Sequence, residues 1–516
     1  MITVQLNEPN FEYDIHSLVK AFYPQHDVLV KAMPREEFPE SVFHLVVNYD
    51  RKNHMIDFKF FEHNQKETQE EDDAAKEETV AQDHENRAMK EKMALDGSVQ
   101  VDFEDRKKTK NELKQQLYYL LTVYAGKTLP WGTLTGIRPT KIPMQMLDEG
   151  KTKEEIASYM KQTYLASDEK INLSIAIAER ERALLSRLDY KNGCSLYIGI
   201  PFCPSTCLYC SFTSYPLTSW KTQVDAYLDA LEKELDYVAA KNYHRKLNSI
   251  YIGGGTPTTL EPYQLDRLIR KIRCSFDLGD CLEFTVEAGR PDSITEEKLL
   301  VLRKNGISRI SINPQTMKQK TLDLIGRHHT VEQTIESFHM ARKLGFDNIN
   351  MDLILGLPGE DAADVRNTME EIMKLAPDNV TVHTLAVKRA SRLREELAQH
   401  DMTTAEALEE MLDISAEYAE RMGMEPYYMY RQKNMVGNFE NVGYCHPGKE
   451  GIYNVQIMEE KQTILAAGAG ASTKTVDPET DRIERVFNVK SIEDYIGRIE
   501  EMIERKRTGL PQGGNI

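Results

Sequence analysis

Hydrophobic positions change their spacing along the chain, and the first 190 residues mix two spacings. Residues 42–50 and 54–63 are rich in β-branched and aromatic residues, which predicts two strands joined as a hairpin. Leucines recur at helical spacing from Leu113 to Leu121, which predicts an amphipathic helix that stops at Gly126. Helical patterns continue to about residue 188. Residues 1–190 are therefore predicted to form an α+β accessory domain.

One segment of this region lacks hydrophobic periodicity. Nine acidic residues fall between Glu67 and Glu85, and Val80 is the only aliphatic residue beyond alanine from Asn64 to Arg87. Such a composition cannot bury enough apolar surface to offset the cost of ordering the chain. We expect a solvated, flexible insertion at about residues 64–96.

From Ser195 onward, short β-rich runs alternate with helical ones. Six strands alternating with helices predict a parallel α/β architecture. The strands are expected at residues 195–202, 249–257, 282–289, 309–315, 348–358 and 379–385, with helices near 219–241, 260–274, 293–305, 330–344 and 361–375.

Polar and glycine-rich motifs gather where these strands end, and the ends of parallel strands share one face. Three cysteines, a glycine triplet, Glu287, Gln315 and Asp352 lie at or near such ends. After about residue 400 the pattern is helical again, and a Tyr- and Gly-rich tail follows. We expect residues 401–516 to form a C-terminal extension that covers the mouth of the α/β unit.

Composition and charge limit the classes of partner that the protein is expected to bind. The 516 residues are 41% hydrophobic and 28% charged, and no apolar run reaches the ~18 residues of a membrane span. A formal net charge of -17 argues against a large nucleic-acid partner, although it leaves room for a local basic pocket. Seven cysteines suit a reducing compartment, and the N-terminus carries no export signal. These features predict a cytoplasmic protein.

The cysteines Cys203, Cys207 and Cys210 form a Cys-x3-Cys-x2-Cys cluster. A structural zinc site needs four ligands, usually as two pairs, and the other four cysteines are scattered. Three thiolates suit a [4Fe–4S] cluster in which one iron keeps an open position for a small chelating ligand. We therefore expect these three cysteines to be cluster ligands.

The stretch "CPSTCLYC" resembles the signature of the radical S-adenosylmethionine (SAM) superfamily. The resemblance implies a partial (β/α)6 barrel over residues 191–400, flanked by the accessory domain 1–190 and the extension 401–516. It also implies a [4Fe–4S] cluster whose fourth iron is chelated by SAM, which is then cleaved to a 5′-deoxyadenosyl radical. The cofactors supply the demanding chemistry in such proteins.

Further motifs narrow the resemblance. "GGGTPT", "VEAGRPD", "SINPQT", "IGRHHT" and "MDLILGLPG" are similar to the oxygen-independent coproporphyrinogen III dehydrogenase family. The tail motifs "YRQKN", "ENVGY" and "GAGASTK", with the additional N-terminal domain, resemble its HemZ-type branch.

The resemblance also implies roles for individual residues. Glu287 matches a carboxylate that binds SAM, and Tyr209 matches an aromatic residue that contacts the adenosyl group or a second SAM. The other implied cofactor-binding residues are Tyr197, which contacts SAM, the loop residues Gly254, Gly255 and Thr256, which hold its amino group, and Gln315, Arg327 and Asp352, which bind a second SAM.

The implied activity is anaerobic oxidative decarboxylation of two propionates of coproporphyrinogen III to vinyl groups in heme biosynthesis, with electrons from a flavodoxin- or ferredoxin-type donor. The substrate carries four carboxylates, so basic residues are expected around it. The candidates are Lys388, Arg389, Arg392, Arg431 and Lys433.

One position departs from that family. Its best-known dehydrogenases carry a further cysteine two residues after the third, where this chain has Phe212. In this respect it resembles the heme-chaperone branch, so a heme-binding chaperone is an alternative. The neighbouring pairs His328–His329 and Cys445–His446 are candidate axial heme ligands. A radical SAM enzyme acting on heme or another substrate is the third hypothesis, and the negative charge disfavours RNA as that substrate.

Overall fold

The computed structural model describes residues 1–37, 39, 41–63, 91–388, 390–396, 399–432 and 439–509. These residues form two compact units. The first unit comprises 1–137, 150–173 and 432–439, and the second comprises 138–149, 174–431 and 440–516. Most of the acidic segment predicted as a flexible insertion lies outside the described residues.

The first unit contains a five-stranded sheet in the order β2-β1-β3-β4-β5. β3 and β4 pair antiparallel from Phe43–Glu62 to Asp50–Met55, which confirms the predicted hairpin. The strands are β1 (Ile2–Leu6), β2 (Val28–Lys31), β3 (Phe43–Asp50), β4 (Met55–His63) and β5 (Glu91–Gln100).

Two helices of this unit, α1 (Glu12–Phe22) and α3 (Arg106–Ala125), pack against each other and share a hydrophobic core with the sheet. The leucines that predicted α3 are buried in this core. The helix ends at Gly126, which has φ of 66° and donates its N–H to the Thr122 carbonyl at 2.9 Å. A third helix, α5, covers Lys153–Tyr164.

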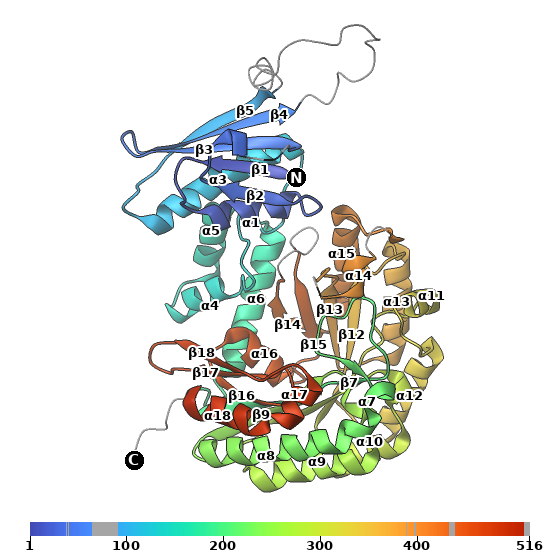
Figure 1. Ribbon diagram of the computed structural model, residues 1–516. Helices are drawn as coiled ribbons and strands as arrows, with labels where there is room; N and C mark the ends of the chain where they lie inside the picture. The colour runs from blue at the N-terminus through green and yellow to red at the C-terminus, as the bar shows by residue number, and fades with distance from the viewer. Residues whose placement is uncertain are drawn as a thin grey trace, which may run out of the picture. The chain divides into compact units, whose positions relative to one another are not determined.

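The second unit contains an eleven-stranded sheet in the order β14-β15-β13-β12-β11-β10-β9-β6-β16-β17-β18 (Figure 1). Its central six strands are parallel, which confirms the predicted partial (β/α)6 barrel. Their C-terminal ends therefore share one edge, where ligands of α/β barrels bind. These strands are β6 (Gly193–Ile200), β9 (Lys246–Gly254), β10 (Glu283–Gly289), β11 (Arg309–Ile312), β12 (Ile349–Leu355) and β13 (Asn379–Thr384).

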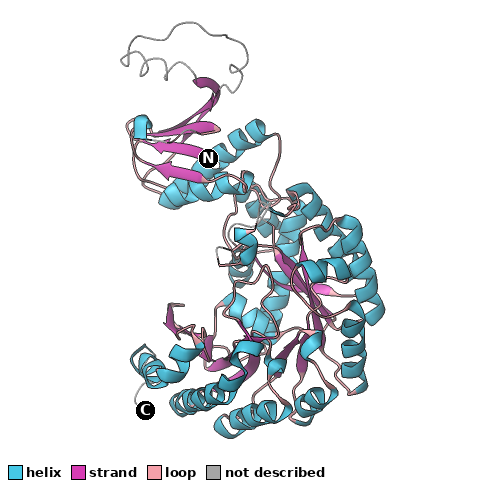
Figure 2. Cartoon of the chain, turned by 45° about the vertical axis from the view of Figure 1, so that its right-hand side comes forward, coloured by secondary structure: helices cyan, strands magenta, loops and turns pink. Residues whose placement is uncertain are grey.

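Helices follow these strands along the chain and lie on the outer side of the curved sheet (Figure 2). The buried face of α8, for example, includes Leu228, Leu231 and Leu235. The helices of this layer are α8 (Val224–Asn242), α9 (Pro262–Ser275), α10 (Glu296–Lys304), α11 (Gln319–Leu324), α12 (Val331–Lys343) and α13 (Ala362–Leu375).

The C-terminal extension adds strands to both ends of the barrel sheet. β15 (Asn441–Cys445) pairs antiparallel with β13, and β14 (Glu425–Tyr430) pairs antiparallel with β15. At the other end of the sheet, β16 (Thr463–Ala467) pairs parallel with β6. β17 covers Ser472–Val476 and β18 covers Ile483–Phe487. The remaining helices are α4 (Lys141–Asp148), α6 (Asp168–Leu185), α7 (Leu217–Trp220), α14 (Arg392–Glu395), α15 (Ala405–Arg421), α16 (Ile452–Glu459), α17 (Ile492–Gly497) and α18 (Ile499–Gly509).

The extension contacts both edges of the central strands. At the N-terminal edge, the Glu283 carboxylate accepts the N–H groups of Ile452 and Tyr453, the first residues of α16. At the C-terminal edge, Tyr227 links the extension to the end of β6, because its hydroxyl donates to the Gly199 carbonyl and accepts the Ala469 N–H. That the extension covers the barrel mouth stays a prediction.

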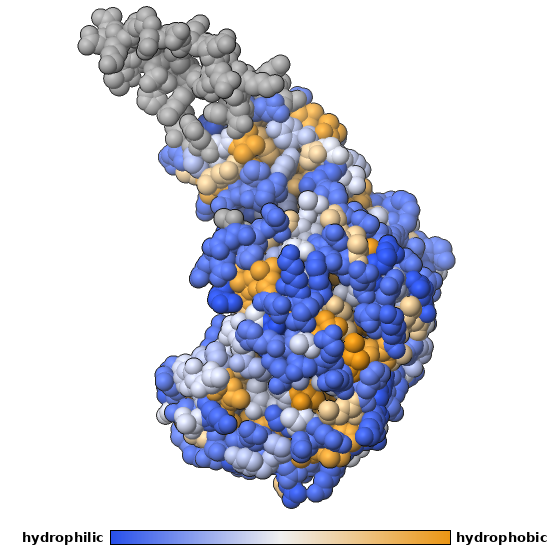
Figure 3. Space-filling view, turned by 90° about the vertical axis from the view of Figure 1, so that its right-hand side faces the viewer, coloured by the Kyte–Doolittle hydropathy of each residue, from blue (hydrophilic) through white to orange (hydrophobic). Residues whose placement is uncertain are grey.

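The face of the second unit seen in Figure 3 is mostly hydrophilic, with small separate hydrophobic patches. Among the helices of the described ranges, none combines the length and apolar character needed to cross a membrane.

Candidate functional site

The three clustered cysteines lie on one loop at the C-terminal edge of the barrel strands. The loop begins at β7 (Phe202–Cys203) and returns at β8 (Tyr215–Pro216), and the two short strands pair in parallel. Cys203 is buried, whereas Cys207 and Cys210 are partly exposed. All three thiols are free, so each can bind a metal.

The surroundings of Cys203 and Cys210 disfavour the thiolate form. Burial raises the pKa of Cys203 to about 12, although the Thr256 hydroxyl, which donates to Cys203 Sγ at 3.6 Å, opposes this shift. Charges on Cys210 and Cys207 raise the pKa further. Burial also raises the pKa of Cys210, whose sulfur lies 3.7 Å from the Ser214 hydroxyl. Metal coordination deprotonates a thiol outright, so these groups become thiolates when a metal binds.

The glycine loop after β9 holds the start of the cysteine loop through its backbone. The N–H groups of Gly255 and Thr256 donate to the carbonyls of Ile200 and Phe202, both at 2.7 Å. A Cβ atom at position 255 would lie 2.6 Å from the Phe202 carbonyl oxygen and 3.0 Å from Cys203 Sγ. Only glycine allows this close approach.

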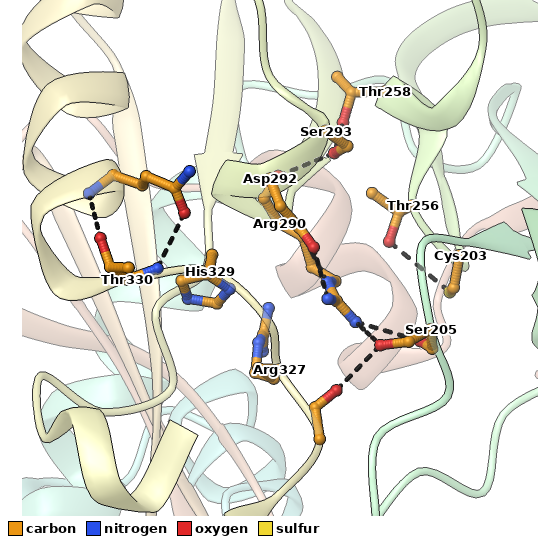
Figure 4. Close-up of polar contacts among 12 residues, drawn as sticks. Cys203, Ser205, Thr256, Thr258, Arg290, Asp292, Ser293, Arg327, His329 and Thr330 are labelled. Carbon is orange, nitrogen blue, oxygen red and sulfur yellow. Dashed lines mark hydrogen bonds and ion pairs between the residues drawn. The ribbon is translucent and has the colours of Figure 1, made fainter. Parts of the chain in front are cut away.

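Arg290, just after β10, fixes the middle of the cysteine loop (Figure 4). Its Nη1 donates to the Ser205 hydroxyl at 2.7 Å and to the Ser205 carbonyl at 3.1 Å. The same guanidinium forms a bidentate pair with Asp292, with distances of 3.0 and 2.6 Å. Ser205 also donates to the Gly326 carbonyl at 2.9 Å. These contacts tie the loop to two further connections of the barrel, those that follow β10 and α11.

Glu287 lies beside the glycine loop on β10. Burial raises its pKa to about 7, the Asp352 charge adds to the shift, and hydrogen bonds from the Tyr251 hydroxyl and the Gly254 N–H oppose it. Gly254 has φ of +106°, a conformation that side chains disfavour. The Glu287 carboxyl group therefore has a pKa close to neutral, well above its ordinary value.

Three tyrosines stack inside the barrel next to this carboxyl group. Tyr197 of β6 lies 6.4 Å from Tyr251 of β9 and 6.2 Å from Tyr453 of α16, measured between ring centroids. The rings of Tyr251 and Tyr453 lie 4.6 Å apart at an angle of 22°. The C-terminal extension thus supplies an aromatic wall to the barrel interior.

Gln315 and Asp352 are joined through their backbones. The Gln315 N–H donates to the Asp352 carbonyl, and the Ile354 N–H donates to the Gln315 carbonyl, both at 2.9 Å. Gln315 has φ of +71°, and its buried Oε1 has no hydrogen-bond partner among the residues that the structure describes. A strained residue with an unused polar atom is typical of a ligand-binding position.

Arg327 and Tyr209 meet on another side of the cysteine loop. Arg327 is 3% exposed, and its Nη1 donates to the Tyr209 hydroxyl at 3.2 Å. The cysteine loop, the glycine loop, Gln315 and Arg327 follow the C-terminal ends of barrel strands. Tyr197, Glu287 and Asp352 lie within β6, β10 and β12.

The candidate heme ligands are arranged differently. His329 is fully buried behind Arg327, whereas its neighbour His328 is exposed. Cys445 is buried and pairs with Asn379, the first residue of β13, so it lies at the opposite edge of the sheet from the cysteine loop. The Cys445–His446 pair is therefore not part of the candidate site.

Comparisons with known proteins match these features. Residues 197–372 match the radical SAM superfamily. The chain is 44% identical over 410 residues, 79% of its length and 82% of the relative, to the "Oxygen-independent coproporphyrinogen-III oxidase-like protein HemZ" of Bacillus subtilis. The chain belongs to the HemZ-type branch of the radical SAM superfamily.

A second relative is the heme chaperone HemW of Bacillus subtilis, 34% identical over 60% of this chain and 76% of that protein. Among solved structures, coproporphyrinogen III oxidase (HemN) from Escherichia coli has a TM-score of 0.49 and 23% identity, covering 62% of this chain and 72% of that one.

Radical SAM proteins use a [4Fe–4S] cluster and SAM, and these are the cofactors of this HemZ-type protein. In the described ranges, no three His, Cys, Asp or Glu side chains converge as ligands of one metal ion. A [4Fe–4S] cluster does not need such convergence, because each thiolate binds a different iron. Three free thiols on one loop, with the side-chain-free backbone of Gly255 beside Cys203, fit this cofactor.

Sequence reasoning missed His383 of β13 and Tyr430 of β14. The His383 Nδ1 atom lies 3.1 Å from the Tyr430 hydroxyl, and its Nε2 lies 4.0 Å from Asp352 Oδ1. Burial lowers the pKa of His383. The position of His383 near the end of the sixth predicted strand was a usable signal. No sequence signal identified Tyr430, because it reaches the site only through β14, a strand of the C-terminal extension.

Proposed function

We propose that this protein is an enzyme that oxidatively decarboxylates two propionates of coproporphyrinogen III to vinyl groups, giving protoporphyrinogen IX. The observation that carries the proposal is the 44% identity, over most of both chains, to a coproporphyrinogen-III oxidase-like protein. For each propionate, the reaction removes one hydrogen atom from the β-carbon, then CO2 and one electron.

We assign Cys203, Cys207 and Cys210 as the three cluster ligands. Their position on one loop and their free thiols support this assignment. With these three thiolates as ligands, a bound cluster and SAM would supply the radical chemistry that begins the reaction. Gly255, Thr256 and Arg290 hold the loop in place for the cofactors.

The SAM-binding residues follow from the same edge of the barrel. In this proposal the Glu287 carboxylate accepts a hydrogen bond from the ammonium group of SAM. The backbone of Gly254, Gly255 and Thr256 approaches the same ammonium group, and Tyr197 contacts SAM. The nearly neutral pKa of Glu287 supports this role, because an approaching cation favours the ionised carboxylate. The unpartnered Gln315 Oε1 supports a second ligand-binding position, together with Tyr209, Arg327 and Asp352.

Basic residues beyond the sixth strand are the proposed contacts for substrate carboxylates. Lys388 is partly buried, and burial lowers its pKa. Arg392 is exposed, and its guanidinium lies beside Gly326, next to the cysteine loop. Arg431 is buried. Arg389 and Lys433 lie outside the described residues. A flavodoxin- or ferredoxin-type protein is the proposed electron donor.

A heme chaperone is the second candidate. It is favoured by the 34% identity to the HemW chaperone and by Phe212, whose 76% exposed side chain stands at the position of the additional cysteine. In this alternative the cluster and SAM site serve binding more than turnover.

An anaerobic assay separates these functions. Reconstituted protein is incubated with SAM, a reductant and coproporphyrinogen III, and vinyl products and 5′-deoxyadenosine are measured. Both products are expected, whereas stoichiometric heme binding without turnover would favour the chaperone. 5′-Deoxyadenosine without a porphyrin product would indicate another substrate.

Cysteine variants test the cluster assignment in the same preparation. Replacing Cys203, Cys207 or Cys210 with Ala should abolish the brown cluster absorbance and all turnover, because one iron of the cluster loses its protein ligand in each variant. Cys274→Ala is the matched control, because Cys274 is an exposed free cysteine on α9. A cluster retained at full iron content in any of the three site variants would rule out that ligand.

A further inference from the structure

Three strands of the barrel carry tyrosine and glutamate side chains on one shared face. In the parallel register of β6, β9 and β10, Tyr197 lies opposite Tyr251, and Tyr251 lies opposite Thr285. Side chains alternate between the two faces of a strand, so Glu287, two residues after Thr285, belongs to this face. Tyr197, Tyr251 and Glu287 are partly exposed there. A ligand inside the barrel can therefore reach all three side chains.

A glycine on the same face lets Tyr251 reach Glu287. The Tyr251 hydroxyl donates to Glu287 Oε1. A Cβ atom on Gly253 would lie 2.7 Å from Tyr251 Cε1 and 2.9 Å from Glu287 Cδ, so a larger residue would push the two side chains apart. Burial and the Glu287 charge raise the pKa of Tyr251 well above its ordinary value, so the hydroxyl keeps the proton that it donates. This hydrogen bond favours the ionised form of Glu287.

Tyr453, a residue of the C-terminal extension, packs against the Tyr251 ring. The two ring centroids lie 4.6 Å apart at an interplanar angle of 22°, which is a stacked pair. Tyr453 is 5% exposed, and its N–H donates to the Glu283 carboxylate at 3.2 Å. At the other end of α16, Arg138 donates to the Met458 carbonyl at 2.9 Å. The anchored helix thereby restricts the direction in which the Tyr251 hydroxyl points.

The other charged groups near Glu287 act on it more weakly than this hydroxyl does. Burial has the largest effect and raises the pKa of Glu287 to about 7, and the Tyr251 hydrogen bond is the strongest influence that opposes it. The Asp352 charge raises the pKa, whereas the Arg309 charge lowers it. In the described part of the chain, the ionisable side chains around Glu287 are Tyr197 of β6, Tyr251 of β9, Arg309 of β11, Asp352 of β12 and Tyr453 of α16.

We propose that Tyr251 and Tyr453 are positioning residues for SAM: the Tyr453 ring holds Tyr251, and the Tyr251 hydroxyl holds the Glu287 carboxylate in place for the ammonium group. The C-terminal extension then takes part in cofactor binding through Tyr453. The inference rests on the proposed role of Glu287 in SAM binding but not on a porphyrin substrate. The family resemblance implies roles for Tyr197 and Glu287, and it assigns none to Tyr251 or Tyr453.

The test is equilibrium dialysis of SAM against the full-length, reconstituted protein at a series of pH values. Wild-type protein should bind SAM more weakly as the pH falls through about 7, because Glu287 takes up a proton. In Tyr251→Phe this loss should begin about one pH unit higher, with about tenfold weaker binding on the acidic side and little change on the alkaline side. Tyr453→Leu should shift the profile in the same direction by less, whereas Tyr453→Phe keeps the ring and should restore the wild-type profile.

Tyr243→Leu is the matched control, because it removes an 86% exposed tyrosine directly after α8. An unchanged pH profile in Tyr251→Phe or in Tyr453→Leu would overturn the proposal. An equal loss of affinity at every pH would also overturn it, because a merely structural role predicts that result.

A second measurement covers a variant that does not load a cluster. In urea unfolding without cofactors, the stability that depends on protonated Glu287 should persist to higher pH in Tyr251→Phe than in wild type. The same pH dependence in both proteins would overturn the proposal. Failure of the proposed SAM site would appear separately, as a Glu287→Gln protein that binds SAM with wild-type affinity.

Discussion

At the residue scale, burial changes the charge state of Glu287. Its pKa is about 7 in the folded protein and 4.5 without that environment, chiefly because of burial. The folded state therefore binds this proton more tightly than the unfolded chain does. The stabilisation is complete below pH 4.5 and is lost as the pH rises to about 7.

Glu287→Gln should remove this pH dependence in the protein without cofactors. Relative to wild type, the variant should gain up to about 3 kcal/mol of unfolding free energy between pH 5 and pH 8, because a shift of one unit is worth about 1.4 kcal/mol. Urea unfolding at both pH values measures the difference. Glu296→Gln, on the exposed start of α10, is the control. If the unfolding free energies of Glu287→Gln and wild type differ by the same amount at both pH values, burial does not raise the pKa of Glu287 as assigned. With cofactors present, the same Glu287 variant should bind SAM more weakly.

At the element scale, two loops from neighbouring strands form one rigid support for the thiols. The glycine loop donates backbone hydrogen bonds to the carbonyls of Ile200 and Phe202, immediately before Cys203. A backbone-to-backbone contact of this kind leaves no flexible group that can move aside. The geometry of the cysteine loop therefore depends on the absence of a side chain at Gly255.

Gly255→Ala should displace the cysteine loop, because its Cβ would lie 2.6 Å from one carbonyl oxygen and 2.9 Å from another. Such overpacking typically costs about 1–3 kcal/mol. We expect reduced iron content after reconstitution and weaker SAM binding, measured by iron assay and calorimetry. Gly497→Ala should behave like wild type, because its Cβ would meet no atom of the described residues within 4 Å. Full iron content and unchanged SAM affinity in Gly255→Ala would show that the loops move independently.

At the scale of the whole molecule, a buried ion pair joins the end of the chain to the barrel. Lys506 of α18 lies 2.6 Å from Glu234 of α8, and both side chains are fully buried. Glu234 also accepts from the Tyr495 hydroxyl and from the Gly468 N–H, in the loop that follows β16. The C-terminal helices are thereby connected to α8 and to the loop that follows β16.

Lys506→Met should destabilise the protein by about 3–5 kcal/mol, because it leaves the Glu234 charge buried without its partner. The double variant Lys506→Met with Glu234→Gln should lose less than the sum of the single variants. Thermal unfolding of the four proteins gives the coupling. Additive losses would indicate that the two groups contribute independently and that α18 is held by packing alone.

Local patterns in the sequence already indicated much of this architecture. The six strand runs correspond to β6 and β9–β13, because buried parallel strands need continuous apolar residues. The cysteine spacing and the adjoining motifs indicated the cofactors, because only cysteine supplies the thiolate ligands of a [4Fe–4S] cluster. These signals are local, so they can be recognised in the sequence without knowledge of the fold.

Contacts between distant segments were decided only by the tertiary structure. The sequence determined the radical SAM class, the order of the barrel strands and the residues at their C-terminal ends. It carried no sign that Tyr453 stacks on Tyr251, that Tyr430 meets His383, or that Arg327 is buried against Tyr209. Such partners depend on which strands become neighbours and on the burial that follows. The pKa of Glu287 depends on that burial, since desolvation acts only after the chain has folded.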